Sequence, residues 1–322
     1  MTIEDETSHK APSRIEGALS RVGAALVVLW LSVTLTFIAL QVAPGDPLQA
    51  IFGPGVTPSP EAIASMRKQF GLDHPVSIRY LAYLVGILHG DLGLSYTTKQ
   101  PVSQLVLGQA GSSLMLTGAS LTLAWLLAVA SVVLTTRRRW RTEAAGRSLE
   151  IIAASLPDFW LGLILITIFA FTLHWFPSAG GDGLQALVLP ALALAIPLAG
   201  WLAQVMRQSF ADALDQPFAL TARARGVGEW RIRLRHALPH AVLPGLALSS
   251  WAVGWLIGGS VAIEQIFARK GIGTLLLAAV SKRDYPVIMG SVFLIAAVYV
   301  AVNLATDAIH VAIDPREPET AS

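Results

Sequence analysis

The sequence predicts an all-α polytopic membrane protein with six transmembrane helices and a folded cap outside the membrane between the first two. Hydrophobic residues make up 54% of the 322 positions and charged residues only 14%, and the mean hydropathy is +0.60. This composition leaves too little polar surface for a soluble domain of this size. Uncharged stretches long enough to cross a bilayer recur along the chain, separated by clusters of proline, glycine or arginine.

The chain opens with a polar leader of mixed charge, residues 1–20, to which we assign no function. Residues 22–42 then run for 21 positions without a charge. At about 1.5 Å per residue this length matches the roughly 30 Å hydrocarbon core, so we predict a first transmembrane helix over residues 21–43. A secretory signal is the alternative, although its apolar region is usually about 7–15 residues long.

The segment 44–111 is predicted to be an external loop that contains short helices. Pro44 and Pro47 end the first span because proline cannot continue helical hydrogen bonding. The Ser59-Pro60-Glu61 sequence begins an amphipathic helix that continues to Phe70, and a second helical piece covers residues 78–88. A turn rich in glycine over residues 90–95 follows. We expect this loop to form the extramembrane cap.

Residues 112–316 are predicted to form a core of five transmembrane helices, followed by a tail over residues 317–322. The expected spans are residues 112–136, 149–171, 184–206, 241–263 and 287–313. Pro190 and Pro197 predict kinks in the fourth of the six spans. Asp158 lies inside the third, where a carboxylate is costly unless it faces protein or water, and a position at a helix end would satisfy that condition.

Lysine and arginine are distributed unevenly between the two sides of the membrane. Fifteen fall in the leader, in the loop after the second span, in the segment 207–240 and in the tail, whereas eight fall in the two opposite loops. This bias predicts that both termini and the basic segment are cytoplasmic. Between Arg223 and Arg235 that segment holds five arginines and a single acid, Glu229, so we expect it to face an acidic or polar partner.

The sequence lacks the residues that several kinds of chemistry require. The chain has no cysteine, and none of its five lysines follows a glycine, as the lysine of a phosphate-binding loop must. His236 and His240 have metal-ligand spacing, but no third ligand is nearby and Pro239 distorts the helix. A net charge of +2 gives little support for nucleic-acid binding. A membrane protease would need a supported acid pair, and Asp158 and Asp307 fall in separate spans without a motif.

The basic segment carries a recognisable pattern. The sequence Thr221-Ala222-Arg223-Ala224-Arg225-Gly226 is followed after nine residues by His236-Ala237-Leu238, and then by Leu243-Pro244. This pattern resembles the cytoplasmic signature of binding-protein-dependent ABC importer permeases, and is most similar to the first permease subunit of the peptide and nickel group. The supporting segments are residues 43–47, 70–73, 90–93, 156–157, 159–162, 284–286 and 314–316.

The resemblance implies the type I ABC importer permease fold and a transport subunit that is not itself an enzyme. It also implies a location in the bacterial inner membrane and four partners: a homologous second permease subunit, two cytoplasmic subunits that bind ATP and Mg, and an external solute-binding protein. The chain itself would bind no cofactor. Peptides, nickel chelates and glutathione are all substrates in keeping with this group. The alternative is a channel or secondary transporter that works without ATP.

In this family the signature forms a short coupling helix that contacts the ATPase. By position, the coupling residues here are Phe218, Thr221, Ala222, Arg223, Ala224, Arg225 and Gly226, and the supporting residues are Arg231, Arg235, His236, Leu238 and Pro239. We expect Arg223 and Arg225 to donate charge-assisted hydrogen bonds to acidic groups of the partner, and Phe218 to provide an apolar anchor. Gly226 would permit a tight turn.

Two of the departures from the family pattern lie in the basic segment. Ala219-Leu220 stands where the family more often has a β-branched residue followed by arginine, and Pro239-His240 stands where the group usually has arginine and asparagine. The binding protein is expected to contact two external segments, Thr57 to Ser95 and Gln265 to Tyr285.

Overall fold

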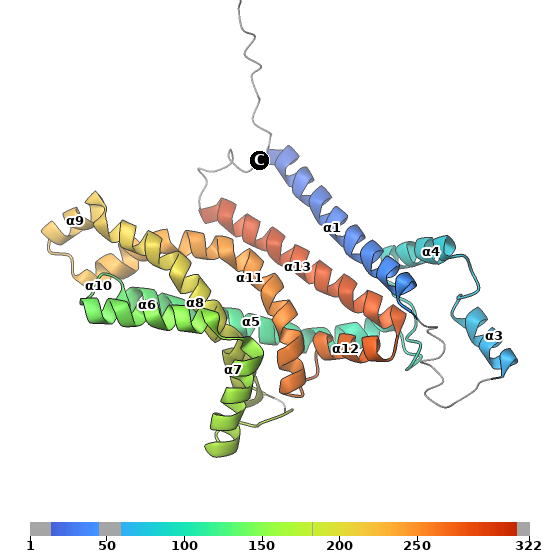
Figure 1. Cartoon of the computed structure of the whole chain (residues 1–322). Helices are drawn as coiled ribbons and strands as arrows, with labels where there is room; N and C mark the ends of the chain where they lie inside the picture. The colour runs from blue at the N-terminus through green and yellow to red at the C-terminus, as the bar shows by residue number, and fades with distance from the viewer. Residues whose placement is uncertain (1–13, 45–58, 182, 314–322) are drawn as a thin grey trace, which may run out of the picture.

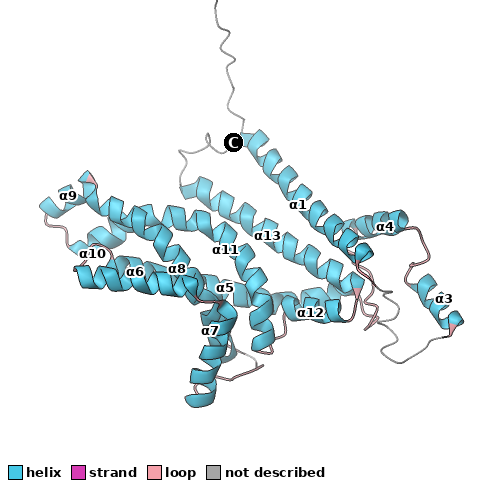
Figure 2. Cartoon of the chain, in the orientation of Figure 1, coloured by secondary structure: helices cyan, strands magenta, loops and turns pink. Residues whose placement is uncertain are grey.

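The computed structural model describes residues 14–44, 59–181 and 183–313, and within these residues it contains only helices, turns and one isolated bridge (Figures 1 and 2). The elements are α1 (Arg14–Val42), α3 (Pro60–Gln69), α4 (Val76–Leu88), α5 (Val102–Thr135), α6 (Trp140–Ser155), α7 (Asp158–Leu165), the π-helix η1 (Ile166–Thr172), α8 (Gln185–Asp215), α9 (Pro217–Ala224), α10 (Glu229–Arg231), the π-helix η2 (Ile232–Ala237), α11 (Leu238–Ile266), α12 (Ile272–Ser281) and α13 (Tyr285–Ile313).

Five of the described helices are long and apolar enough to cross a membrane, and the bent pair α6 and α7 with η1 brings the number to six. The predicted all-α, multi-pass class is therefore confirmed. Most of the predicted leader, the loop residues 45–58 and the tail lie outside the described residues.

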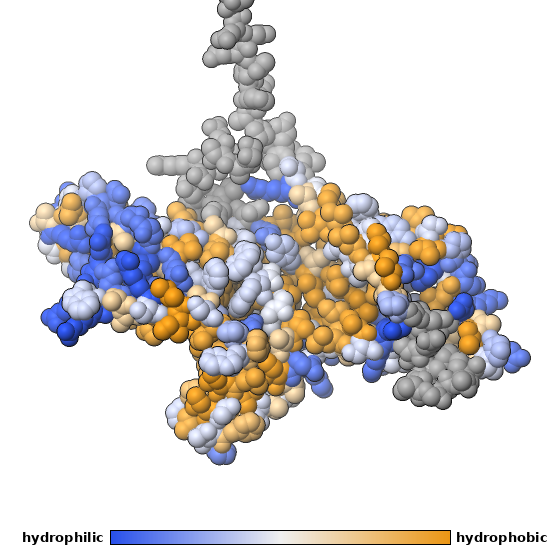
Figure 3. Space-filling view, viewed as in Figure 1, coloured by the Kyte–Doolittle hydropathy of each residue, from blue (hydrophilic) through white to orange (hydrophobic). Residues whose placement is uncertain are grey.

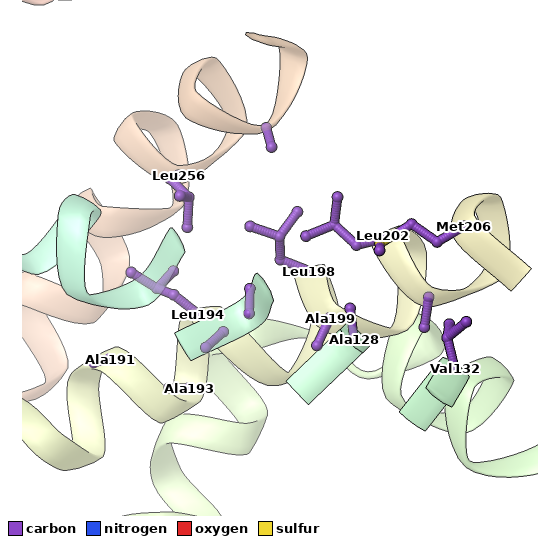
Figure 4. Close-up of a cluster of buried hydrophobic side chains, with 14 of the residues drawn as sticks. Ala128, Val132, Ala191, Ala193, Leu194, Leu198, Ala199, Leu202, Met206 and Leu256 are labelled. Carbon is purple, nitrogen blue, oxygen red and sulfur yellow. The ribbon is translucent and has the colours of Figure 1, made fainter. Parts of the chain in front are cut away.

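Helix α8 is the centre of the bundle. In its most apolar stretch 78% of the residues are buried, whereas the corresponding value for α1 is 11%. Small residues let neighbouring helices approach it closely: a Cβ on Gly200 would stand 2.6 Å from the Glu150 carbonyl oxygen of α6. Figure 4 shows Leu194 and Leu198 of α8 in the cluster with Leu256 of α11. α1 instead packs beside α13 at the edge of the bundle (Figure 1).

The third expected span is broken. Helix α6 ends at Ser155, and the direction of the chain changes by 102° before α7 and η1 continue. Leu156 is extended (φ −78°, ψ 128°) because the proline that follows it disfavours helical geometry. Asp158 begins α7, so it does lie at a helix end, where the helix dipole favours a carboxylate. The third span over residues 149–171 is thus a bent pair of helices that begins earlier, at Trp140.

Two further helix boundaries differ from those expected. Helix α5 begins at Val102 rather than at residue 112, and its first turns bury Val102 and Val106 against the start of α13. Polar residues lie on the other faces of these first turns of α5, and they led to the prediction of a loop for this segment. Helix α8 continues nine residues past the expected end of the fourth span, to Asp215, so Arg207 belongs to a helix.

Buried carboxylates fix the end of the bundle opposite α9. Asp284, just before α13, accepts hydrogen bonds from the Ser95 hydroxyl at 2.5 Å and from the backbone N–H groups of Tyr96 and Thr97 at 3.1 Å. Glu264 of α11 accepts from the Ser113 hydroxyl of α5 at 2.6 Å. These bonds hold the loop before α5, and α5 itself, against α13 and α11.

Candidate functional site

Helix α9 carries the segment that the sequence singles out, and its ends follow from local chemistry. Pro217 occupies the first turn, where its missing N–H has no helical partner to lose. At the other end, Gly226 adopts φ +78° and its N–H donates to the Arg223 carbonyl at 2.9 Å. That left-handed conformation suits glycine and ends the helix. α9 is therefore a separate eight-residue helix at the far end of α8 (Figure 1).

One side chain of α9 is completely buried in the rest of the protein. Ala219 is completely buried, while Leu220, Thr221, Ala224 and Arg225 are exposed. Hydrophilic residues gather around this end of the molecule, whereas hydrophobic residues cover its middle (Figure 3). The outer face of α9 is thus open to a partner, and we call it the coupling face, defined by Leu220, Thr221, Ala224 and Arg225.

Phe218 connects α9 to the first turn of α11. Its ring stacks on that of His240 with 5.4 Å between the centroids and an interplanar angle of 24°, and the residue remains 39% exposed. His240 is one of the residues that departs from the family pattern, so the substitution creates an aromatic contact here. Phe218 therefore has one surface against the protein and another available to a partner.

Arg223 is held within the chain. Its Nη1 donates to the Leu214 carbonyl at the end of α8 at 3.1 Å, and its Nε lies 3.3 Å from Glu229 Oε2. The carbonyls of the last helical turn have no intrahelical partners, so this arginine satisfies one of them. The pair with Glu229 is about 40% exposed and contributes about 0–1 kcal/mol. Arg223 therefore positions α9 relative to α8, and Arg225 is the arginine that the coupling face presents.

Arg233, which the sequence analysis did not select, is the most deeply buried arginine of the segment, with 1% of its side chain exposed. It lies in η2, and its Nη1 donates to the carbonyls of Thr136 at 2.8 Å and Val133 at 3.0 Å. Its Nη2 donates to the Arg137 carbonyl at 3.3 Å. A guanidinium thus satisfies three carbonyls at the end of α5.

Glu229 connects these two arginines. Its Oε1 lies 3.3 Å from Arg233 Nε, within ion-pair distance although not aligned as a hydrogen bond, and its Oε2 pairs with Arg223. Glu229, the single acid between Arg223 and Arg235, therefore joins α9 to the arginine that holds the end of α5. The only sequence signal for Arg233 was its spacing of four residues from Glu229, which places both on one helical face.

A second buried ion pair lies at the same end of the bundle. Arg207 of α8 donates through Nε to Glu150 Oε2 of α6 at 2.8 Å, and both side chains are less than 10% exposed. The same guanidinium donates to the hydroxyls of Thr135 at 2.7 Å and Thr136 at 2.9 Å. Arg137 also forms an exposed ion pair with Asp215. The end of α5 is therefore bonded to α6, α8 and η2 together.

The predicted supporting residues have a smaller part in this arrangement. Arg231 and Arg235 are exposed, and Pro239 is exposed in the first turn of α11. His236 and Leu238 are half-buried, and Leu238 packs on the main apolar cluster. The residues that hold the segment in place are instead Arg233, Glu229 and Arg223.

Comparisons with known proteins agree with this architecture. Residues 120–317 match the family described as binding-protein-dependent transport system inner membrane component, and residues 16–117 match the family of its N-terminal part. A Brucella ovis protein named as a peptide permease is 36% identical over 310 residues, covering 92% of this chain and 97% of that protein. The glutathione transport system permease protein GsiC of Salmonella choleraesuis is 35% identical over 299 residues, with the same coverage.

The fold is similar to that of solved transporters. The MetNI methionine ABC transporter, in its inward-facing conformation, aligns with a TM-score of 0.51 and 18% identity over 65% of this chain and 96% of that chain. A second crystal form of the same transporter aligns with a TM-score of 0.50. The chain therefore belongs to the family of binding-protein-dependent inner membrane components, the permease subunits of ABC importers.

Proposed function

We propose that this permease subunit takes up peptides or a related small solute, such as a nickel chelate or glutathione, and that α9 is the helix through which ATP hydrolysis acts. The observation that carries the proposal is the coupling face: four exposed residues on a short helix whose opposite side is buried and bonded to α8. Relatives named for peptide and glutathione transport support the substrate class.

The proposal includes four partners. Two ATP-binding subunits supply ATP and Mg²⁺, and one of them receives the coupling face in a groove. A second, homologous permease completes the pathway, and a solute-binding protein docks on the opposite side through residues within Thr57 to Ser95 and Gln265 to Tyr285. The family description favours the bacterial inner membrane, and the bias of lysine and arginine favours both termini in the cytoplasm.

The contacts suggest a route for the movement. When the ATPases close, they displace α9, and Arg223 passes the displacement to the end of α8 through the Leu214 carbonyl. Glu229 transmits the same displacement to Arg233, which is hydrogen-bonded to the end of α5. Because both arginines share one carboxylate, α5 and α8 move together. Helix α6, the first part of the third span, follows α8 through the Arg207 and Glu150 pair.

Reconstitution tests the proposal. The chain and its companion permease are placed in liposomes with the solute-binding protein supplied outside and the ATPase subunits and Mg-ATP supplied at the α9 side. We expect uptake of a labelled di- or tripeptide, glutathione or a nickel chelate that requires ATP hydrolysis and stops when the ATPases are omitted.

The matched control replaces ATP with a proton or sodium gradient in liposomes that contain the permease subunits alone. Uptake driven by the gradient would favour the channel or secondary-transporter alternative and overturn the proposal. If uptake needs ATP but none of the three solute classes is transported, the proposed ATP-driven mechanism stands and the proposed substrate class is wrong.

A further inference from the structure

Helix α4 is a short apolar helix that packs against the core with one side only, through Tyr80, Tyr83, Leu84 and Ile87. It has 13 residues, too few to cross a bilayer, and none of them is buried. The other short apolar helix among the described residues, α12, buries Ile272, Gly273 and Ala279. An apolar stretch of this length is normally either a core helix or an interfacial one. Because no residue of α4 is fully buried, the side of the helix that faces away from the protein must contact something outside this chain.

One side of α4 packs against the membrane helices well inside their apolar stretch. The Tyr80 hydroxyl lies 2.7 Å from Thr34 Oγ1 of α1, and the Tyr80 ring lies 5.3 Å from that of Phe37. Thr34 is eight residues before the end of α1, which corresponds to about 12 Å along the helix axis. Helix α4 therefore crosses α1 at a level where α1 is surrounded by the bilayer.

The opposite side of α4 is apolar and uncovered. Its exposed large hydrophobic side chains are Val76, Ile78, Leu81, Val85 and Leu88, between 49% and 84% exposed. At the same level, α1 exposes Leu31, Leu35 and Ile38 by 41–62%. The two surfaces adjoin through the Thr34 and Tyr80 contact, so the exposed side of α4 continues the lipid-facing surface of α1.

The polar groups of α4 fit a helix lying in the interface. Its one charged residue, Arg79, is half-buried and interacts with Tyr96, so the charge is directed toward the protein. Polar residues flank both ends, with His74 before the helix and His89 after it, both exposed. A helix that lies in the plane of the interface keeps its ends near the headgroups while one face meets acyl chains.

We propose that α4 inserts its exposed face, Leu81 and Val85 at its centre, among the acyl chains of the leaflet opposite the coupling face. The segment expected to be an external loop would thus be divided. Helix α4 anchors it in the membrane, and the polar helix α3 remains in water. The partner of this surface is the lipid hydrocarbon, rather than a protein.

Because the chain has no cysteine, single cysteines can test this proposal without background. The full chain, with Leu81→Cys or Val85→Cys labelled by a bimane fluorophore, is reconstituted into liposomes with and without brominated phosphatidylcholine. Leu35→Cys on α1 is the lipid-facing control, and Ser65→Cys, exposed on α3, is the aqueous control. We expect quenching at Leu81 within about twofold of that at Leu35, and at least about threefold greater than that at Ser65.

Reaction of the unlabelled cysteines with a membrane-impermeant maleimide provides the second measurement. Slow reaction at Leu81 together with strong quenching supports insertion. Fast reaction without quenching would show that the exposed face of α4 lies in water. Slow reaction without quenching would show that protein covers this face. Either result overturns the proposal. The assay uses neither ATP nor solute, so its outcome is independent of the proposed transport function.

Discussion

Arg233 Nη1 donates to the carbonyl oxygen of Thr136 at 2.8 Å, across 97 residues of sequence. This bond joins the segment after the coupling helix to the end of α5. The Arg233 side chain is held in place because its guanidinium is buried and donates to two further carbonyls at the same helix end.

Replacing Arg233 with leucine should separate transport from ATP hydrolysis. The substitution leaves carbonyls of α5 unsatisfied at a buried site, each at about 1–3 kcal/mol. We expect a lower unfolding temperature of the purified chain and at least tenfold less uptake per ATP hydrolysed in the reconstituted importer.

Arg231→Leu is the matched control, because Arg231 is exposed and only two residues away. Normal coupling in Arg233→Leu, with the unfolding temperature also unchanged, would contradict the assigned link. Arg233→Lys should recover part of the coupling, since an ammonium can still donate to one or two of the carbonyls.

Reversing the charge of Arg225 should weaken the ATPase contact without disturbing the fold. Its side chain is exposed on the coupling face, and a repulsive carboxylate there opposes an acidic groove. We expect Arg225→Glu to bind the ATPase subunits about tenfold more weakly in a pull-down titration. Arg139→Glu makes the same charge change at an exposed helix start nearby and should bind normally. Equal affinity of both variants would remove Arg225 from the contact.

The turn after α9 should depend on Gly226 through backbone conformation alone. A Cβ at Gly226 would meet nothing within 4 Å, but φ is +78°, and an L-residue there costs about 1–2 kcal/mol. Gly228 is equally unobstructed and has φ −63°. Gly226→Ala should therefore lower the unfolding temperature and the coupling, while Gly228→Ala changes neither. Thermal unfolding followed by circular dichroism compares the two, and identical curves would contradict the turn assignment.

The Arg207 and Glu150 pair should behave as a unit. Removing one partner leaves a buried charge, which costs about 3–5 kcal/mol, whereas replacing both with apolar residues costs much less. We expect Arg207→Met and Glu150→Leu each to destabilise the chain more than the double variant does. A double-mutant cycle of unfolding free energies measures this, and simple additivity would show that the two side chains do not interact energetically.

Alkaline pH should weaken the packing around Tyr96. Burial raises the pKa of its hydroxyl to about 12, against about 10 in an unfolded chain. The native state therefore holds this proton more tightly, and the stability is complete below pH 10 and is lost as the pH rises through 12. The absorbance at 295 nm, with Tyr96→Phe subtracted, should titrate near pH 12. A midpoint near 10 would mean that the hydroxyl is accessible to water.

Much of the architecture is visible in the sequence because hydrophobic length and charge placement are local properties. The first span and the basic segment follow from those patterns, whereas the short helix was implied by the resemblance to the permease family and has the bounds Pro217–Ala224 in the structure. The break at Pro157 is only partly visible: proline restricts Leu156, but packing against α8 and α11 fixes the angle of 102°.

Side-chain roles were harder to predict. Arg223, Arg225 and Arg233 look alike in sequence, yet Arg233 is buried because the end of α5 lies beside it, and Arg223 is bonded because the last turn of α8, with Leu214, lies there. Which arginine is free for a partner depends on contacts between residues far apart in the chain. The lipid-facing side of α4 was missed for a similar reason, since the segment lies in a long polar loop.

Helix α5 extends for 34 residues, or about 50 Å, and so exceeds the roughly 30 Å hydrocarbon thickness. Arg233 donates hydrogen bonds to carbonyls at one end of α5, and at the other end Val102 is buried beside Tyr285 at the start of α13. A single uninterrupted rod therefore joins the two faces of the membrane. A displacement of the end of α5 at Thr136 would therefore reach Val102 through continuous helix, without any flexible loop in between.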